Sequence, residues 1–207
     1  MTNRDFVLFV IEDRKAPYND QILSLADVYF KLVVEDLEKR NNFNYMRREA
    51  LVTLLADNYY ISFTEHIKQF REVIDKQRGF KLLGDEDTKA LYMYNPDRKA
   101  VPSRYYYSPS DRKLYFDCAV AMPTEYILSY YVFTYNTNLV NPDQTHPLLN
   151  ENKTLLLHAL SYWIERYFTA DLNLEAGRKE LAEALERSSQ SMQRFTKAQV
   201  KFDFRRY

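Results

Sequence analysis

Two kinds of apolar pattern follow one another along this chain of 207 residues, and they limit the folds that it can adopt. Up to about residue 78, and again over 150–197, apolar residues recur every three or four positions, as on one face of an amphipathic helix. Between about 80 and 135 the chain is rich in Tyr, Phe and Val and is interrupted by turn residues, which is typical of short strands. Helices followed by strands and then by helices predict an α+β fold instead of alternating βαβ units.

We therefore predict a single, mainly helical α+β domain over residues 1–199, with a small antiparallel β-hairpin or sheet inserted at about 80–135 and an extended tail over 200–207. The helices are expected over about 20–78 and 150–197. The first of these ranges contains a regular helical repeat that stops at Gly79, a natural helix terminator. The members of that repeat are Tyr60, Phe63, Ile67, Phe70 and Ile74.

The clearest feature of the strand region is the hairpin pattern "RYYYSPSDRKLYFDCAV", in which a turn at 108–111 separates two strands. Successive side chains of a strand point to opposite faces, so Tyr105, Tyr106 and Tyr107 cannot all face the core. We assign these three tyrosines and Tyr115 to a candidate contact between subunits. The alternative is that the hairpin serves core packing, with Tyr105 and Tyr107 facing the core and Tyr106 facing out, or the reverse.

Composition argues against several classes of function. The formal net charge is zero, with 29 basic and 29 acidic residues, whereas a nucleic-acid binder usually has a basic excess. The stretch "PDRKAVPSRYYYS" keeps that class open as a minor alternative. The three histidines lack a second His or Cys at metal-ligand spacing, Cys118 is the only cysteine, and 3 Gly exclude the usual phosphate loop. We expect no catalytic residue, no metal and no cofactor, and therefore no enzyme.

The N-terminal apolar run at 6–11 is too short to span a membrane. Glu12 and Asp13 follow it where a signal peptide would have small residues for cleavage. The sequence therefore predicts no membrane association and a chain made and kept in the cytoplasm.

The C-terminal stretch "KAQVKFDFRRY" alternates apolar and polar residues, which indicates an extended segment and not a continued helix. Such a segment suits addition to a sheet edge, or binding in a groove, of another chain. Docking onto its own domain and simple fraying are the alternatives. The residues that we assign to partner binding are Val200, Phe202, Phe204, Arg205, Arg206 and Tyr207.

The order of these patterns resembles that of the head-to-tail adaptor (connector) proteins of tailed bacteriophages. A helical pair comes first, then "RYYYSPSDRKLYFD" and "EYILSYYVFTY", and then a loop leads through "HPLLNENKTLLLHALSYWIERYF" into a long charged helix and an extended tail. The resemblance covers the chain from about Gln21 to its end and lies in the order of elements more than in motifs.

The resemblance implies a structural subunit of a homo-oligomeric ring, usually of twelve copies, that docks on the portal protein and contacts further neck or tail proteins. It implies that the ring extends the DNA channel toward the tail, that DNA passes without sequence-specific binding, and that the C-terminal tail docks into the portal. The expected location is the virion, at the head–tail interface, after synthesis in the host cytoplasm.

A second hypothesis is a small cytoplasmic α+β enzyme or regulatory binding protein whose site no motif announces. Its site would need a pocket with acids of shifted pKa, for which Glu49, Glu65, His66 and His158 are the candidates. A ligand-dependent rise in melting temperature would favour this hypothesis.

Overall fold

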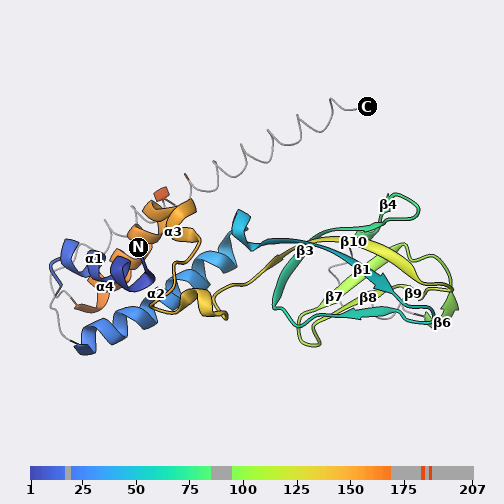
Figure 1. Ribbon diagram of the computed structural model, residues 1–207, viewed down its shortest axis with the longest axis horizontal. Coiled ribbons are helices and arrows are strands. Elements are labelled where there is room, and N and C mark those ends of the chain that lie inside the picture. The colour runs from blue at the N-terminus through green and yellow to red at the C-terminus, as the bar shows by residue number, and fades with distance from the viewer. Residues whose placement is uncertain (17–19, 85–94, 169–182, 185–186, 188–207) are drawn as a thin grey trace, which may run out of the picture. The chain divides into compact units, whose positions relative to one another are not determined.

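The computed structural model describes residues 1–16, 20–84, 95–168, 183–184 and 187, and Figure 1 labels the helices and strands. The chain forms two compact units. The first is helical and takes in Met1–Tyr45 together with the described residues from Thr134 onward, and the second is the β unit, Met46–Phe133. The β unit is thus an insertion: the chain leaves the helical unit after Tyr45 and returns to it at Thr134.

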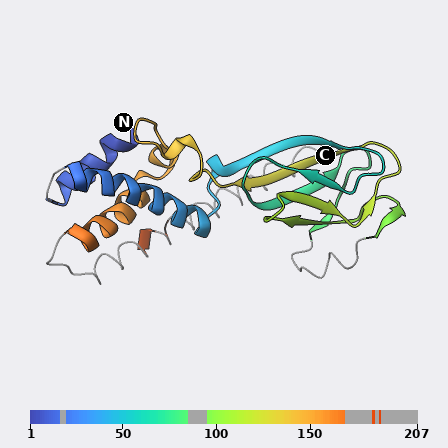
Figure 2. The ribbon, with the colours of Figure 1, turned by 90° about the horizontal axis from the view of Figure 1, so that it is seen from below.

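The helical unit contains four α-helices in its described part, with a 3₁₀ turn before the third (Figure 2). The α-helices are α1 (Asn3–Asp13), α2 (Asp20–Arg40), α3 (Leu148–Glu151) and α4 (Lys153–Phe168), and the 3₁₀ turn is η3 (Asn138–Val140). A capping box fixes the start of α1, because the Thr2 hydroxyl accepts the Asp5 amide proton and the Asp5 carboxylate accepts that of Thr2. The helices α1, α2 and α4 contact one another in pairs and bury the unit's apolar core. That core includes Phe6, Val10, Phe30, Val33, Leu37, Leu156, Leu160 and Ile164.

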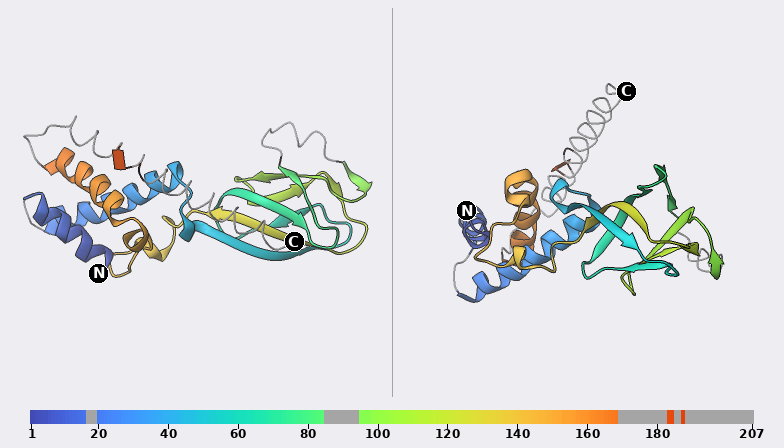
Figure 3. Two further views of the ribbon diagram at one scale, coloured as in Figure 1. Left: turned by 90° about the horizontal axis from the view of Figure 1, so that it is seen from above. Right: turned by 45° about the vertical axis from the view of Figure 1, so that its right-hand side comes forward.

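The β unit consists of ten short strands in three sheets within its described residues (Figure 3). In chain order they are β1 (Arg47–Leu54), β2 (Tyr60–Ser62), β3 (Ile67–Asp75), β4 (Phe80–Lys81), β5 (Leu83–Gly84), β6 (Asn95–Lys99), β7 (Arg104–Ser108), β8 (Lys113–Phe116), β9 (Cys118–Ala119) and β10 (Thr124–Val132). One sheet has the order β1-β10-β3-β4, the second β2-β8-β7-β5, and the third pairs β6 with β9.

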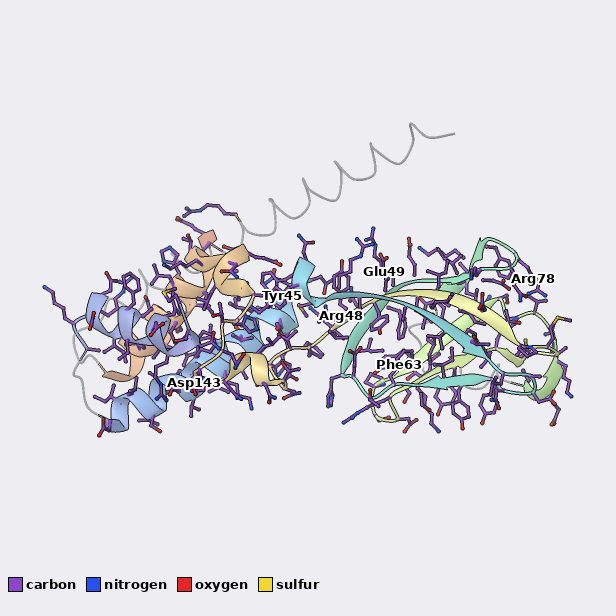
Figure 4. The ribbon with its side chains drawn as sticks, in the orientation of Figure 1. Tyr45, Arg48, Glu49, Phe63, Arg78 and Asp143 are labelled. Carbon is purple, nitrogen blue, oxygen red and sulfur yellow. The ribbon has the colours of Figure 1, made fainter. Side chains whose placement is uncertain are left out.

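One apolar cluster joins the two four-stranded sheets and forms the core of the β unit. Phe116 of β8 and Tyr126 of β10 lie at its centre, with ring centroids 4.8 Å apart and both side chains buried. Phe63, at the loop before β3, packs against the same cluster (Figure 4). The β unit therefore has its own core, as an independently folded insertion requires.

The prediction of a mainly helical fold with a small β insertion is wrong. The structure is a mixed α+β fold with about 31% strand and 37% helix, and its described residues form three sheets and four helices. The range from about 47 to 75, predicted to be helix, forms β1, β2 and β3. Figure 4 shows Arg48 and Glu49 on the first of these strands.

Two β-bulges explain why β3 has the spacing of a helix. The pairing with β10 runs Ser129↔Glu72 and then Tyr130↔Phe70, so Arg71 is an extra residue; Lys68 is skipped in the same way between Gln69 and Ile67. Each bulge shifts the strand's alternation by one residue. Ile67, Phe70 and Val73 consequently all contribute to the core at intervals of three, which imitates one face of a helix.

Other predictions for the described residues are confirmed. The hairpin exists as β7 and β8, with Ser108 opposite Lys113 across the turn. The segment "EYILSYYVFTY" contributes most of β10, and "KTLLLHALSYWIERYF" is α4. The part of the predicted helical range 150–197 that follows residue 168 falls almost entirely outside the described residues, and the predicted tail, 200–207, falls wholly outside them.

A buried carboxylate holds together the two ends of the helical unit's interrupted chain. Glu38, near the end of α2, has no exposed surface. One carboxylate oxygen accepts the amide protons of Thr134, at 2.7 Å, and Tyr135, at 3.2 Å. The other accepts the hydroxyl protons of Thr134 and of Tyr45, the latter at 3.1 Å. Glu38 therefore binds the chain on both sides of the insertion, where it leaves at Tyr45 and where it returns at Thr134 and Tyr135.

We expect Glu38→Ala to lower the free energy of unfolding of the helical unit by about 3 kcal/mol or more, because four donors lose a buried charged acceptor. Trp163, the only tryptophan, lies in α4 and reports on this unit by fluorescence during urea unfolding. Glu35→Ala is the matched control, since Glu35 is on the same helix in a solvent-facing pair with Lys39 and should cost less than about 0.5 kcal/mol. Equal losses in the two variants would contradict the role of Glu38.

Candidate functional site

Three tyrosines form a row across the sheet β2-β8-β7. Tyr115 of β8 lies opposite Tyr60 of β2 on one side and opposite Tyr106 of β7 on the other. Directly paired residues of antiparallel strands point to the same face, so the three rings share one face of the sheet. The neighbouring row, Ile61, Leu114 and Tyr107, points the other way, into the core. The tyrosine row is therefore on the outer face.

Ring and charge contacts fix the orientation of these tyrosines. Tyr59 stacks on Tyr115 with centroids 6.1 Å apart, and its ring is 5.1 Å from that of Tyr60. The Lys113 ammonium lies 4.3 Å from the centre of the Tyr60 ring, a cation–π contact. The Tyr115 hydroxyl donates to Asp111 at 3.4 Å, and partial burial together with this carboxylate raises the pKa of Tyr115. The row is thus a set of half-exposed rings that are held in place before any partner arrives.

Such a surface suits contact with another protein. Tyrosine offers a large apolar area with a polar tip and loses little conformational entropy when it is buried, and it is enriched in interfaces for these reasons. The structure places two of the four predicted contact residues, Tyr106 and Tyr115, in this row. Tyr105 and Tyr107 instead face inward and pack against the core. Sequence reasoning missed Tyr59 and Tyr60 because it assigned them to a helix.

A groove of about 610 Å³ lies on the same unit, between β3 and β7. Its aromatic members make ring contacts with one another, because the Phe70 ring is 6.0 Å from Tyr105 and 5.2 Å from Tyr107. A Cβ atom at Gly84 would lie 2.8 Å from the Tyr105 hydroxyl, so a glycine there allows the ring its position. The lining residues are Lys68, Gln69, Phe70, Arg71, Lys81, Gly84, Tyr105, Tyr106, Tyr107 and Pro109.

The groove is basic. Lys68, Arg71 and Lys81 line it, and its described lining includes no acidic side chain. Lys81 forms an ion pair with Glu72 at 3.2 Å, and both partners are partly exposed. Basic side chains therefore outnumber acidic ones among the described residues of the lining, although the whole chain has a net charge of zero.

A buried hydrogen-bonded chain in the helical unit contains the three kinds of group of a nucleophilic triad, but the hydroxyl, and not the imidazole, is in the middle. The Glu38 carboxylate accepts from the Thr134 hydroxyl, which lies 3.0 Å from His146 Nε2. The Leu148 amide donates to His146 Nδ1 at 3.2 Å, so the ring proton is on Nε2 and is donated to Thr134. Glu38 and His146 have no exposed surface and Thr134 has 2%. A substrate does not reach these groups in this structure, and their bonds serve the fold.

The other side chains considered for chemistry do not form a common site. Glu49 is exposed on β1, Glu65 accepts a bond from Tyr130 at 3.3 Å, and His66 is exposed next to it. His158 belongs to α4, in the other unit. Burial raises the pKa of the Cys118 thiol, which is consistent with a structural cysteine. The six predicted partner-binding residues of the tail lie outside the described residues.

Among the described residues, no group of three or more His, Cys, Asp or Glu side chains could hold a metal ion. No helix of this part of the chain is both long and apolar enough to cross a lipid bilayer. In comparisons with known proteins, no family model matches the chain and no curated protein matches it.

Burial of His146 makes the stability of the helical unit depend on pH. Burial lowers the pKa of His146 to about 4, whereas the unfolded chain has the ordinary value near 6.5. Below 6.5 the unfolded state therefore binds a proton that the folded state does not. We expect this histidine to remove up to about 3 kcal/mol of stability as the pH falls from about 6.5 to 4. Glu38 acts in the opposite direction, because burial raises its pKa and favours the folded state as the pH falls.

The comparison of His146→Gln with the wild-type protein isolates the histidine contribution. Urea unfolding followed by Trp163 fluorescence between pH 7 and 4 should show a smaller loss of stability in the variant, whatever its stability at pH 7. The exposed His66 provides a control, since His66→Gln should keep the wild-type pH dependence. An unchanged slope in His146→Gln would show that another group carries the effect.

Proposed function

We propose that this protein is a structural subunit of a phage head-to-tail connector ring, which docks on the portal and extends the DNA channel toward the tail. The observation that carries the proposal is the tyrosine row of Tyr60, Tyr115 and Tyr106, a preformed surface suited to protein contact. The order of elements also supports it. The helix α2, a tyrosine-rich hairpin, and a loop with His146 and Pro147 before α4 follow one another in the order that the resemblance implies, whereas the second helix of the expected pair is replaced by strands.

A ring places particular demands on its subunit. A closed ring forms when one patch of each copy contacts a different patch of the next copy, and when the rotations from copy to copy add up to a full turn. The tyrosine row provides one such patch, and its aromatic side chains are already held in position by Tyr59, Lys113 and Asp111. Zero net charge reduces the repulsion between copies. Both features favour self-association, and neither is needed by a protein that acts alone.

The proposal also includes the partners and the location that the resemblance implies. The ring, usually of twelve copies, contacts the portal protein on one side and further neck or tail proteins on the other. DNA passes through without sequence-specific binding, and the protein resides in the virion at the head–tail interface after synthesis in the host cytoplasm. The C-terminal segment 200–207 docks on the portal.

A second candidate function is a small enzyme or regulatory binding protein. The groove favours it, because its volume of about 610 Å³ falls in the range of small-molecule sites. A small ligand that raises the melting temperature of the β unit, and whose effect is lost when the lining is changed, would support this candidate over the first.

The double substitution Tyr106→Ser and Tyr115→Ser tests the tyrosine row. We expect it to abolish assembly of the protein ring with the cognate portal. The contact area of two rigid tyrosine side chains is lost, while the core behind them remains. Electron microscopy and native mass spectrometry of portal complexes measure the result. Tyr131→Ser is the control, since Tyr131 is a half-exposed tyrosine of β10 in the other four-stranded sheet. Rings that form normally with the double variant would contradict this role.

Two matched double substitutions test the tail. We expect Phe202→Ser with Phe204→Ser to reduce portal binding to the level of a chain that ends at Gln199, because the apolar side anchors an extended segment. Lys201→Ser with Asp203→Ser changes the opposite side and should retain most of the binding. A pull-down with purified portal quantifies both variants. Equal effects would argue against an extended, one-sided contact, and full binding by the truncated chain would argue against any role of the tail.

A further inference from the structure

We infer that the tyrosine row of one copy packs against an aliphatic row on the β unit of the next copy. The aliphatic row is defined by Leu51, Ile127 and Ile74. The inference rests on the proposed function, because it names the surface of a second copy of this chain that the tyrosine row contacts in the ring. Three observations carry it: the outward position of the aliphatic row, its match in width to the tyrosine row, and the charges beside the two rows.

The aliphatic row crosses the sheet β1-β10-β3 at one level. Leu51 of β1 pairs with Ile127 of β10, which pairs on its other side with Ile74 of β3, so the three side chains share one face. The residues before and after them along the strands include the core members Ala50, Val52, Tyr126, Leu128 and Val73. The aliphatic row is therefore on the outer face of the sheet, and Leu51 and Ile127 are 55% and 40% exposed.

The two rows point away from each other. Phe116 of β8 and Tyr126 of β10 meet in the core with ring centroids 4.8 Å apart. Tyr115 and Ile127, the neighbouring residues along these two strands, therefore point in opposite directions. A contact between the rows thus cannot form within one copy. In a line of copies joined by unlike rows, one row of each kind stays unoccupied at the two ends, until they meet in a closed ring.

The two rows match in width. Each has three side chains on three adjacent strands, and adjacent strands are about 4.8 Å apart, so both rows extend over about 10 Å. The rings of Tyr60 and Tyr115 have centroids 6.0 Å apart, which lets one branched aliphatic side chain pack on each ring. Contact between half-exposed rings and exposed aliphatic side chains removes apolar surface of both copies from water, which drives association.

The charges beside the rows are complementary. Lys113 lies on the face of the tyrosine row, two residues from Tyr115, and its ammonium is 4.3 Å from the centre of one ring of the row. Glu49 and Glu72 lie on the face of the aliphatic row, one on each side of Ser129 in the next paired row. When the two rows align, Lys113 of one copy comes between these two carboxylates of the next. Complementary charge of this kind selects the partner and its orientation.

The ion pairs that these glutamates already form do not prevent this contact. Glu49 pairs with Arg47, and Glu72 pairs with Lys81, and all four side chains are at least 35% exposed. Ion pairs between exposed side chains are weak, and a carboxylate accepts several hydrogen bonds. Both carboxylates can therefore accept a further bond from Lys113 of a neighbouring copy.

Charge also favours one direction of alignment. Asp117 lies on the other side of the tyrosine row, where the pairing with β7 continues, and it would meet Glu49 and Glu72 if the rows were aligned in the opposite direction. In the favoured direction Asp117 meets Glu125 instead, whose charge Lys76 balances at 2.7 Å. The repulsion is therefore smaller in the direction that brings Lys113 to the two glutamates.

Zero-length cross-linking of the wild-type full chain tests the contact directly. A carbodiimide joins a lysine amine to a carboxylate only where the two groups touch. We expect links from Lys113 to Glu49 or Glu72, and in an equimolar mixture of unlabelled and isotope-labelled chains these links should join peptides of different label. The link from Lys81 to Glu72, whose nitrogen and oxygen atoms are 3.2 Å apart within one copy, is the internal control and should join peptides of the same label. Formation of the control link without any link from Lys113 to these glutamates would overturn the inference.

Two double variants test whether the contact joins unlike rows. Tyr106→Ser with Tyr115→Ser removes the tyrosine row, and Leu51→Ser with Ile127→Ser removes the aliphatic row. We expect each variant alone to self-associate at least about tenfold more weakly than the wild-type protein. An equimolar mixture of the two should form dimers that grow no further, because each chain keeps one intact row and the two intact rows are of different kinds. Sedimentation velocity of the purified chains at up to about 1 mM measures the result.

Leu55→Ser with Met122→Ser is the matched control. Both residues are 59% exposed and lie beside the ends of β1 and β10, outside the aliphatic row. This variant should self-associate within about twofold of the wild-type protein. Tyr131, the control residue of the ring experiment, is on the same face as Ile127 but about 13 Å from it along β10, and so it is also outside the row.

Three results of the sedimentation experiment would overturn the inference. They are a wild-type protein that stays monomeric up to about 1 mM, a mixture of the two variants that forms no dimer, and a variant that alone associates as tightly as the wild-type protein. None of these measurements requires a portal. A negative result therefore leaves the connector proposal standing with another neighbour for the tyrosine row, whereas association of copies without portal binding would support this contact and reject the connector.

Discussion

The buried carboxylate of Glu38 is the interaction on which this two-unit design depends. An insertion of the size of Met46–Phe133 interrupts the helical unit, and the two ends of the interruption have to be held where they leave and re-enter it. Burying a charge costs several kcal/mol unless its hydrogen bonds are satisfied. Here four donors from Tyr45, Thr134 and Tyr135 satisfy it, and they come from both ends of the interruption. The cost of burying Glu38 is offset only when both ends of the interruption, at Tyr45 and at Thr134, are in place.

The same network extends to the N-terminus through His146. The imidazole donates to Thr134, and the His146 amide donates to the Asn3 side chain at 2.8 Å. Asn3 in turn donates to the carbonyls of Leu139 and Asn141. One buried cluster of hydrogen bonds therefore joins three segments: the start of α1, the point where the chain re-enters the helical unit at Thr134, and the loop before α3. The hydroxyl and backbone donors of this cluster satisfy a buried acid, and its closure to solvent is what a structural role requires.

The sequence predicts the parts of this fold whose signals are local. The turn at 108–111 and the alternation around it predict the β7–β8 hairpin, and the broad apolar face of 153–168 predicts α4. Strand β3 was missed because the bulges at Lys68 and Arg71 replace an interval of two by an interval of three. Tyr59 and Tyr60 were lost from the candidate site because Tyr60 stands at the head of the same apparent helical repeat. The Glu38 cluster could not be predicted, since Glu38 and Thr134 are 96 residues apart and nothing local in the sequence marks them as partners.

The tyrosine triplet of β7 connects two surfaces of the β unit. Strand alternation sends Tyr105 and Tyr107 inward, where they contact Phe70 of the groove, and sends Tyr106 outward, opposite Tyr115 in the tyrosine row. One short strand thus serves two different patches, one aromatic and one basic. Because the patches differ, each is suited to meet an unlike patch, either on the next copy or on another protein. A subunit with two unlike patches is the kind that builds rings and stacked assemblies, since unlike contacts can propagate from copy to copy while the second patch remains available.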